Sequence, residues 1–291
     1  MLIISAIISG LGLGSMYGLL ALGFHVTHAV SRTVNFAQGS TMMLGAVLSF
    51  TLWVTLKWPL PVAVVAALLG CAIWGAAVEL VAVRPFAARG SNSWLIATVA
   101  LGIVLDNVVL FTFGKDPRGM PGGLLTTGTI AVGGLRIEYL QALIPVVGLL
   151  LAAGLQVLFA TSRHGKALLA VVQNRDAARL MGIKVERVVQ FAYVLSGLLA
   201  GIAGILVAPL FTVSSTMGTL FGIKAFAVAI LGGIESPWGV VLAGLIYGVV
   251  EASITALLGS TYTQIATFAL VILALAVRPN GLFGRAALRK V

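Results

Sequence analysis

The residues of this chain that could do chemistry are few, and many of them are gathered in one stretch. Residues 173–188 read QNRDAARLMGIKVERV and carry six charged side chains, whereas the whole 291-residue chain has 18 Lys and Arg and 8 Asp and Glu. Arginine and aspartate side chains on a solvent-facing helix form charge pairs that fix the register of a protein contact. Taken alone, such a stretch is most simply a solvated connector between two long apolar runs, and its charges would also suit a contact with a partner.

The sequence shows none of the patterns that are typical of a catalytic or metal site. A phosphate-binding loop needs G-x-x-x-x-G-K-[ST], but in HGKAL (164–168) Ala167 follows the Gly-Lys pair and Ala160 replaces the first glycine. No HExxH pair is present, and two lone histidines, His25 and His28, rarely make a metal site. We therefore expect no catalytic residues, no metal and no cofactor in this chain.

The composition indicates an integral membrane protein. The chain is 60% hydrophobic and 9% charged, whereas soluble domains are about a quarter charged. The net charge of +10 does not indicate a nucleic-acid partner, because Lys and Arg collect in the cytoplasmic loops of helical membrane proteins. We expect an all-α transmembrane helix bundle embedded in the lipid bilayer, forming a single domain over residues 1–291.

About eight segments approach the roughly 20 apolar residues that a membrane-spanning helix needs. They are 2–24, 36–56, 59–82, 93–113, 139–160, 189–211, 238–257 and the shorter 262–277. A ninth apolar piece, 221–233, is only part of a span, and Gly232, Gly233 and Pro237 predict a broken or re-entrant segment over 221–237. If 221–233 crosses, most basic residues fall on the cytoplasmic side, with the N-terminus outside and the C-terminus inside.

Small residues predict where helices approach closely. Gly10, Gly14 and Gly18 repeat every four residues and so share one helix face, as do Gly244 and Gly248. Such spacing lets the backbones of two membrane helices come together. Segment 114–138, which is rich in Gly and Pro, is expected to be an outer loop with turns.

The central loop, 161–188, is expected to contain a short solvent-facing helix. Asn174 can cap its first turn and Gly182 is a natural stop. The loop could be a plain connector. However, Asp176-Ala177-Ala178, three further residues and then Gly182 resemble the EAA-xxx-G loop of ABC importer permeases, with Asp in place of Glu.

Four further stretches extend this resemblance over nearly the whole chain. The sequence resembles the shorter of the two permease types of branched-chain amino acid ABC importers. The similar stretches are TVNFAQGSTMMLGA (33–46), ELVAVRPFAARGS (79–91), FAVAILGGIESPWGVVLAGLIYG (226–248) and VRPNGLFG (277–284). Asp106, beside Asn107, departs from the pattern, since an uncharged amide is commoner there in such permeases.

The resemblance implies a bacterial inner-membrane subunit without enzymatic activity of its own. It implies a heterodimer with a second permease, two ATPase subunits that hold ATP and Mg, and a periplasmic substrate-binding protein. The solute would be a branched-chain amino acid or a similar small polar or zwitterionic molecule. Coupling to the ATPases would run through the 161–188 loop, with the contact made by Arg175, Asp176, Ala177, Ala178, Arg179 and Gly182.

Polar residues within or beside the apolar segments are candidates for the translocation pathway, because charge inside a membrane is costly and usually functional. They are Asn35, Gln38, Asp106, Asn107 and Glu251. These residues could instead have structural roles. Asn35 and Gln38 could cap a helix, and Asp106 and Glu251 could form buried structural pairs. Glu79 is expected to reach the membrane surface or to pair with Arg84.

An alternative function belongs to another class of protein. A stand-alone secondary transporter or channel could use the break at 221–237 as its solute or ion site. It would work without ATP and without a stable ATPase partner.

Overall fold

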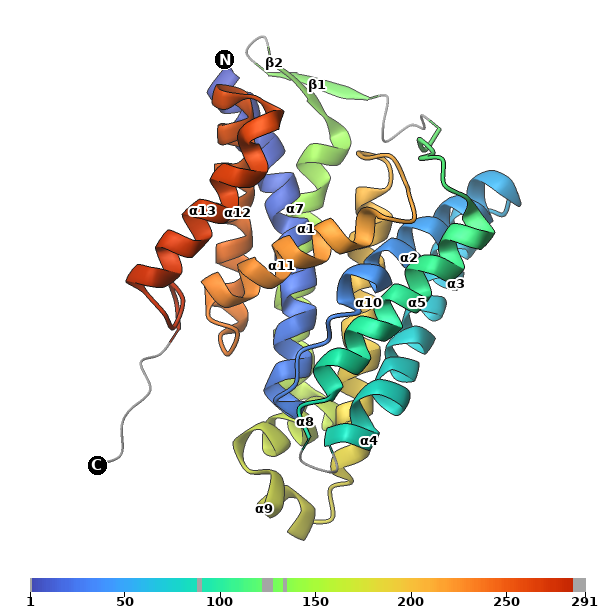
Figure 1. Ribbon diagram of the computed structural model, residues 1–291, viewed down its shortest axis with the longest axis vertical. Helices are drawn as coiled ribbons and strands as arrows, with labels where there is room; N and C mark the ends of the chain where they lie inside the picture. The colour runs from blue at the N-terminus through green and yellow to red at the C-terminus, as the bar shows by residue number, and fades with distance from the viewer. Residues whose placement is uncertain (1, 88–90, 122–127, 133–134, 285–291) are drawn as a thin grey trace. The chain divides into compact units, whose positions relative to one another are not determined.

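The computed structural model describes residues 2–87, 91–121, 128–132 and 135–284 (Figure 1). It confirms an all-α bundle. Among the described residues, seven helices are long and apolar enough to cross a membrane, and the 16-residue helix α11 (Met217–Gly232) is a shorter apolar one. The chain divides into two compact units built from discontinuous segments, one formed by 1–25, 122–152 and 224–291 and the other by 26–121 and 153–223.

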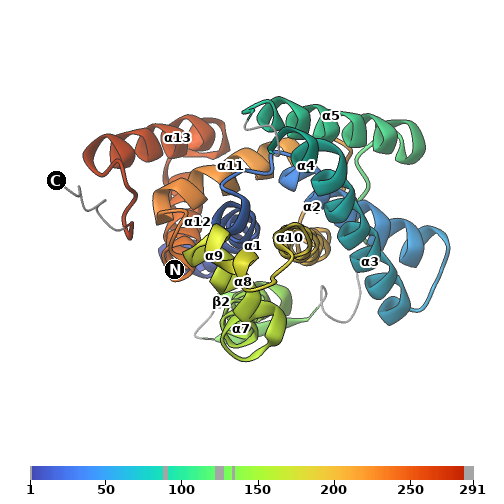
Figure 2. The same ribbon diagram turned by 90° about the horizontal axis from the view of Figure 1, so that it is seen from below.

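The first unit is organised around α1 (Leu2–Ser31) and α12 (Pro237–Leu258), which lie side by side (Figures 1 and 2). A Cβ atom at Gly14 would lie 2.8 Å from the Cα of Leu245, and one at Gly244 would lie 2.7 Å from the Cα of Gly18. The glycine spacing in the sequence therefore marked a real interface, since only glycine permits backbones this close. Helix α13 (Ser260–Val277) turns back along α12 at Gly259.

The loop before α7 in this unit contains a short β-hairpin, which was not predicted from the sequence. Strands β1 (Thr129–Val132) and β2 (Leu135–Glu138) pair antiparallel, with Val132 opposite Leu135. Helix α7 (Tyr139–Thr161) follows directly.

The second unit is built on three mutually packed helices (Figure 2). They are α2 (Gln38–Phe50), α3 (Leu60–Val78) and α10 (Val185–Val207). Helix α2 continues into a π-helical turn, η1 (Thr51–Thr55), while α3 continues through η2 (Glu79–Val83) into α4 (Arg84–Ala87). Helix α5 (Trp94–Phe113) packs against α2 and η2.

Segment 36–56, which was predicted to span, is not among the seven apolar spans. It forms α2 and η1, and the polar side chains of Gln38, Ser40, Thr41 and Ser49 are buried in protein. These side chains lower its hydropathy without exposing polar groups to lipid, because α3 and α10 cover them. The helix is thus an interior one.

Candidate functional site

The central charged loop folds into two short helices, α8 (Arg163–Gln173) and α9 (Arg175–Leu180). The Asn174 side-chain oxygen accepts hydrogen bonds from the backbone N–H of Asp176 at 3.1 Å and of Ala177 at 3.0 Å, which caps α9. At the other end, Gly182 has φ +81°. Ile183 N–H donates to the Ala178 oxygen and Gly182 N–H donates to the Arg179 oxygen. These two bonds form a Schellman stop, so both ends of α9 are fixed.

The two alanines of the Asp-Ala-Ala motif lie on different faces of α9. Ala178 is buried in the hydrophobic cluster that Val30, Val83 and Val189 share with other residues of the second unit. Ala177 is exposed, as are Arg175, Asp176 and Arg179. Ala178 therefore holds α9 to its own chain, and the charged face with Ala177 is free to meet a partner.

Two apolar residues extend the exposed face of α9, and the sequence analysis missed them. Leu180 is 88% exposed and Met181 is 82% exposed. The sequence does contain a pattern that could have identified them: two large apolar residues directly follow a charged helical turn. Large apolar side chains that project from a capped helix are typical anchors for a protein contact.

Asn35 and Gln38 lie together at the start of α2, fully buried. Asn35 accepts a hydrogen bond from the backbone N–H of Ala37 at 3.1 Å. Gln38 accepts from the Ser196 hydroxyl at 2.8 Å and donates to the Ser196 carbonyl oxygen at 3.1 Å. The two amides thus shape the entry to α2 and join it to α10; their pathway role stays a prediction.

Asn107 is exposed on α5 beside Val104 and Val108, whereas Asp106 is half-buried. Asp106 Oδ2 accepts from the Thr219 hydroxyl at 3.4 Å, and Oδ1 has no hydrogen-bond partner in the described structure. Asn107 donates to the Ile103 carbonyl oxygen at 2.8 Å. A carboxylate within a span is costly in lipid, and the pathway role of Asp106 and Asn107 stays a prediction.

Glu251 lies in the interior of the first unit, paired with Lys224. Lys224 Nζ donates to Glu251 Oε1 at 2.5 Å. The hydroxyl of Tyr17 is 3.5 Å from Lys224 Nζ, and the ring of Tyr247 packs edge-on against Tyr17. The Tyr247 hydroxyl and Glu251 Oε2 are buried without a hydrogen-bond partner in the described structure. The sequence analysis did not identify Lys224 as the partner of Glu251.

The break after α11 is a tight turn on which the C-terminal motif packs. Helix α11 ends at Gly232, Gly233 has φ +79°, and the Ser236 hydroxyl caps α12, whose first residue is Pro237. Leu282 N–H donates to the Leu231 carbonyl oxygen. The stretches 226–248 and 277–284, which are distant in sequence, thus form one structure.

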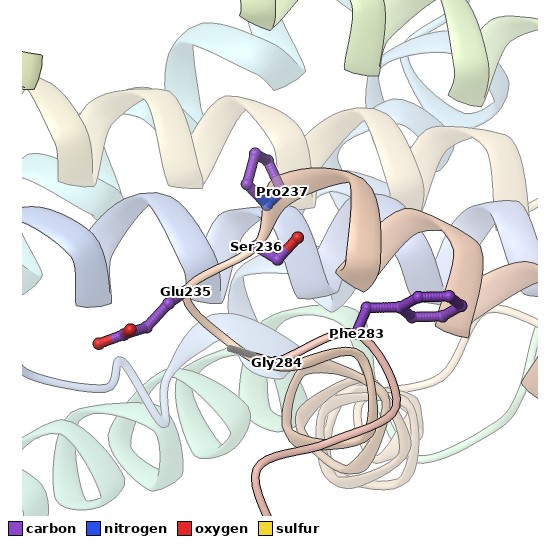
Figure 3. Close-up of a pocket in the computed structure, with 5 residues that line it drawn as sticks. All are labelled: Glu235, Ser236, Pro237, Phe283 and Gly284. Carbon is purple, nitrogen blue, oxygen red and sulfur yellow. The ribbon is translucent and has the colours of Figure 1, made fainter. Parts of the chain in front are cut away.

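A pocket of about 290 Å³ lies at this junction, lined by Glu235, Ser236, Pro237, Phe283 and Gly284. Figure 3 shows the side chains of Glu235 and Phe283 pointing in opposite directions from it. His25 Nδ1 donates to the carbonyl oxygen of Ile234, 2.7 Å away, and so contacts the same turn. The imidazole of His25 therefore has a structural partner at the break.

The candidate pathway residues are divided between the two units, and their pathway role stays a prediction. In the described parts of the second unit, no hydrogen bond joins Asn35 or Gln38 to Asp106, and Glu251 belongs to the first unit. Nor do three His, Cys, Asp or Glu residues come together as metal ligands within the described segments. What the second unit offers is a capped, charged and partly apolar helix, α9, with an exposed face.

Comparison with known proteins identifies the family. Residues 6–275 match the model described as the branched-chain amino acid transport system / permease component. The chain is 32% identical to the high-affinity branched-chain amino acid transport system permease protein BraD of Pseudomonas aeruginosa, over 98% of this chain and 97% of that protein. It is 33% identical to the permease protein LivH of the same transport system in Escherichia coli K12, over 97% and 96% of the two chains.

A more distant relative transports another kind of solute. The ribose import permease protein RbsC of Escherichia coli K12 is 29% identical over 89% of this chain and 80% of its own length. The full-length matches, the seven apolar spans and the α9 projection agree with one another. This chain belongs to the family of branched-chain amino acid transport system permease components.

Proposed function

We propose that this chain is a transmembrane permease subunit of an ATP-driven importer. Its solute is a branched-chain amino acid or a similar small zwitterion, delivered by a periplasmic binding protein. A second permease subunit completes the channel, and two separate ATPase subunits hold the ATP and Mg. The chain lies in the bacterial inner membrane with its N-terminus outside and its C-terminus in the cytoplasm, as the distribution of basic residues favours.

The observation that carries this proposal is the exposed face of α9. Arg175, Asp176 and Arg179 offer charge to a partner, and Leu180 and Met181 offer apolar area. Water-exposed apolar side chains of this size cost free energy unless a partner covers them. A helix that is capped at both ends can transmit motion from that partner, because its buried residue Ala178 ties it to α10 and η2.

The role of the permease is alternating access without bond chemistry. ATP binding and hydrolysis on the partner subunits shift the balance between two arrangements of the helices. An apolar bundle with few charged groups suits an aliphatic solute whose charges cancel. Because the relatives include a ribose permease, the solute has to be measured with the complete complex.

The docking face can be tested by changing the two apolar residues at its end. Leu180→Asp with Met181→Asp is expected to weaken association with the ATPase subunits by about 30-fold or more, as for a contact hot spot. ATP-driven uptake should fall with it. Leu169→Asp is the matched control, since Leu169 is an exposed apolar residue of the neighbouring helix α8. A triple replacement of Arg175, Asp176 and Arg179 tests the charged part of the same face.

Uptake assays in proteoliposomes separate this proposal from the alternative. The complete complex should take up leucine with ATP and lose uptake when the ATPases are omitted. Uptake by this chain alone, without ATP, would instead support a secondary transporter that uses the break at 221–237. Parallel assays with urea, an amide, an aromatic acid and ribose identify the solute.

A further inference from the structure

A second pocket, of about 260 Å³, lies behind α9 in the second unit. Arg175 and Arg179 of α9 line it together with Arg84 of α4. Two acidic side chains, Glu79 of η2 and Glu186 of α10, complete its charged lining. Helices that are far apart in sequence therefore bring three guanidinium groups to one cavity.

The charges of this pocket do not cancel. Glu79 is engaged by Arg84 through two hydrogen bonds, of 3.0 Å from Nε and 2.9 Å from Nη2, so this pair is neutral as a whole. Arg175 and Arg179 form no ion pair with any described residue. They face the single carboxylate of Glu186, which leaves an excess of positive charge.

The pocket lies where an apolar span ends. Arg84 and Ala87 close the apolar helical run Leu60–Ala87, and α9 belongs to the loop between the spans of α7 and α10. The phosphate groups of a bilayer lie at such span ends. Basic pockets at the cytoplasmic ends of spans are typical binding sites for anionic headgroups.

The rest of the lining suits a headgroup and not a larger ligand. Val83, Ala87 and Val189 contribute apolar wall, which matches the carbon atoms of a glycerol ester. Leu80 and Val81 of the same helical run are exposed apolar side chains that suit acyl chains outside the pocket. The volume is below the range of about 300–1,000 Å³ that is common for drug-sized ligands.

We propose that this pocket binds a phosphate group, with an anionic phospholipid headgroup as its source. Arginine guanidinium groups bind phosphate oxygens through paired hydrogen bonds, and here the arginines of the lining outnumber its carboxylates by three to two. A phosphate bound by Arg175 and Arg179, beside the Arg84–Glu79 pair, joins α9 to the end of the helical run that contains η2 and α4. The proposal goes beyond the transport function; because Arg175 and Arg179 also belong to the proposed docking face, lipid binding is measured on this chain without the ATPase subunits.

The test uses the purified full-length chain and measures lipid binding by native mass spectrometry. Phosphatidylglycerol should bind more tightly than phosphatidylcholine, and Arg175→Gln or Arg179→Gln should each weaken its binding about fivefold. Glu186→Gln removes the opposing carboxylate and should strengthen binding. Arg163→Gln with Lys166→Gln is the control, since it removes two exposed positive charges of α8 that do not line the pocket.

Competition with inorganic phosphate distinguishes the two sources of the phosphate group. If the chain prefers phosphatidylglycerol and this preference depends on Arg175 and Arg179, the phosphate in the pocket belongs to a lipid headgroup. Displacement by inorganic phosphate, with the same dependence on the arginines and no lipid preference, assigns free phosphate to the same pocket. The proposal would be overturned if the arginine variants and the α8 control lost the same amount of affinity for phosphatidylglycerol. Weaker binding of phosphatidylglycerol by Glu186→Gln would also overturn it. The Glu186 variant keeps the test informative if an arginine variant folds poorly.

Discussion

Lys224 and Glu251 form a close ion pair inside the helix bundle, at 2.5 Å between Nζ and Oε1. Their side chains are only 7% and 9% exposed, and both lie near the middle of their helices, α11 and α12. A buried charge is stable only with its partner. The pair therefore binds the short helix α11 to α12, with Tyr17 of α1 alongside.

Glu251→Gln is expected to destabilise the chain by about 3–5 kcal/mol, because Lys224 would remain as an uncompensated buried charge. Thermal unfolding in detergent measures this loss. Replacing both residues by apolar ones, Lys224→Met with Glu251→Leu, should recover most of it. If the double variant recovers stability and uptake, the pair is structural. Recovery of stability without uptake would instead support the predicted pathway role of Glu251.

Gly45→Ala should separate α2 from α10. A Cβ at Gly45 would lie 2.7 Å from the carbonyl oxygen of Gly201 and 2.8 Å from its Cα, and neither backbone atom can move alone. Overpacking of this kind costs roughly 1–3 kcal/mol, measured as a lower unfolding temperature. The matched control is Gly154→Ala in α7, where nothing lies within 4 Å. There the better helix former should leave stability unchanged or raise it by up to about 1 kcal/mol.

Gly281→Ala should release the C-terminal motif from the turn at Gly233. Gly281 has φ +83°, and a Cβ there would lie 2.6 Å from Gly233 N and from the Ile230 oxygen. Hydrogen exchange at Leu282, which donates to Leu231, should become faster. Gly259→Ala is the control that separates the steric clash of the new Cβ atom from the backbone strain of alanine at positive φ. Gly259 has φ +85°, but nothing lies near its Cβ position. That control should show only the left-handed strain of roughly 1–2 kcal/mol; equal effects of the two variants would contradict the packing argument.

Asn174→Ala should loosen α9 without unfolding the bundle. The Asn174 side chain satisfies two N–H groups of the first turn, and loss of such a cap costs about 0.5–2 kcal/mol. Hydrogen exchange should rise over residues 175–181 and stay unchanged in α10. Gln173→Ala, one residue earlier and also exposed, serves as the control. Faster exchange throughout α8, α9 and α10 would show that the cap supports more than α9.

Several features could be predicted from the sequence because they depend on neighbouring residues. Apolar runs of sufficient length predicted most of the spans, and the glycine spacing in α1 and α12 predicted a close contact. Asn174 and Gly182 predicted both ends of α9, since caps and left-handed stops act within one helical turn. The pairing of Glu79 with Arg84, five residues apart, was accessible for the same reason.

Other features were decided by the tertiary structure. Segment 36–56 could not be identified as an interior helix, because its burial depends on α3 and α10 covering it. The inward position of Ala178 depends on which face of α9 meets the hydrophobic cluster. The ion pair of Lys224 and Glu251 and the pocket of Arg84, Arg175 and Arg179 join residues that are separated by many positions.

By itself, then, the sequence determined the class of protein, the positions of most helices and the motif stretches of the permease family. Composition, caps and glycine spacing are local signals, and each can be read within a few turns of helix. The tertiary structure alone decided which polar groups meet, since helix packing brings together side chains that no local pattern relates. For this chain that packing made a buried ion pair of Lys224 and Glu251 and brought three arginines to the lining of one pocket beside α9.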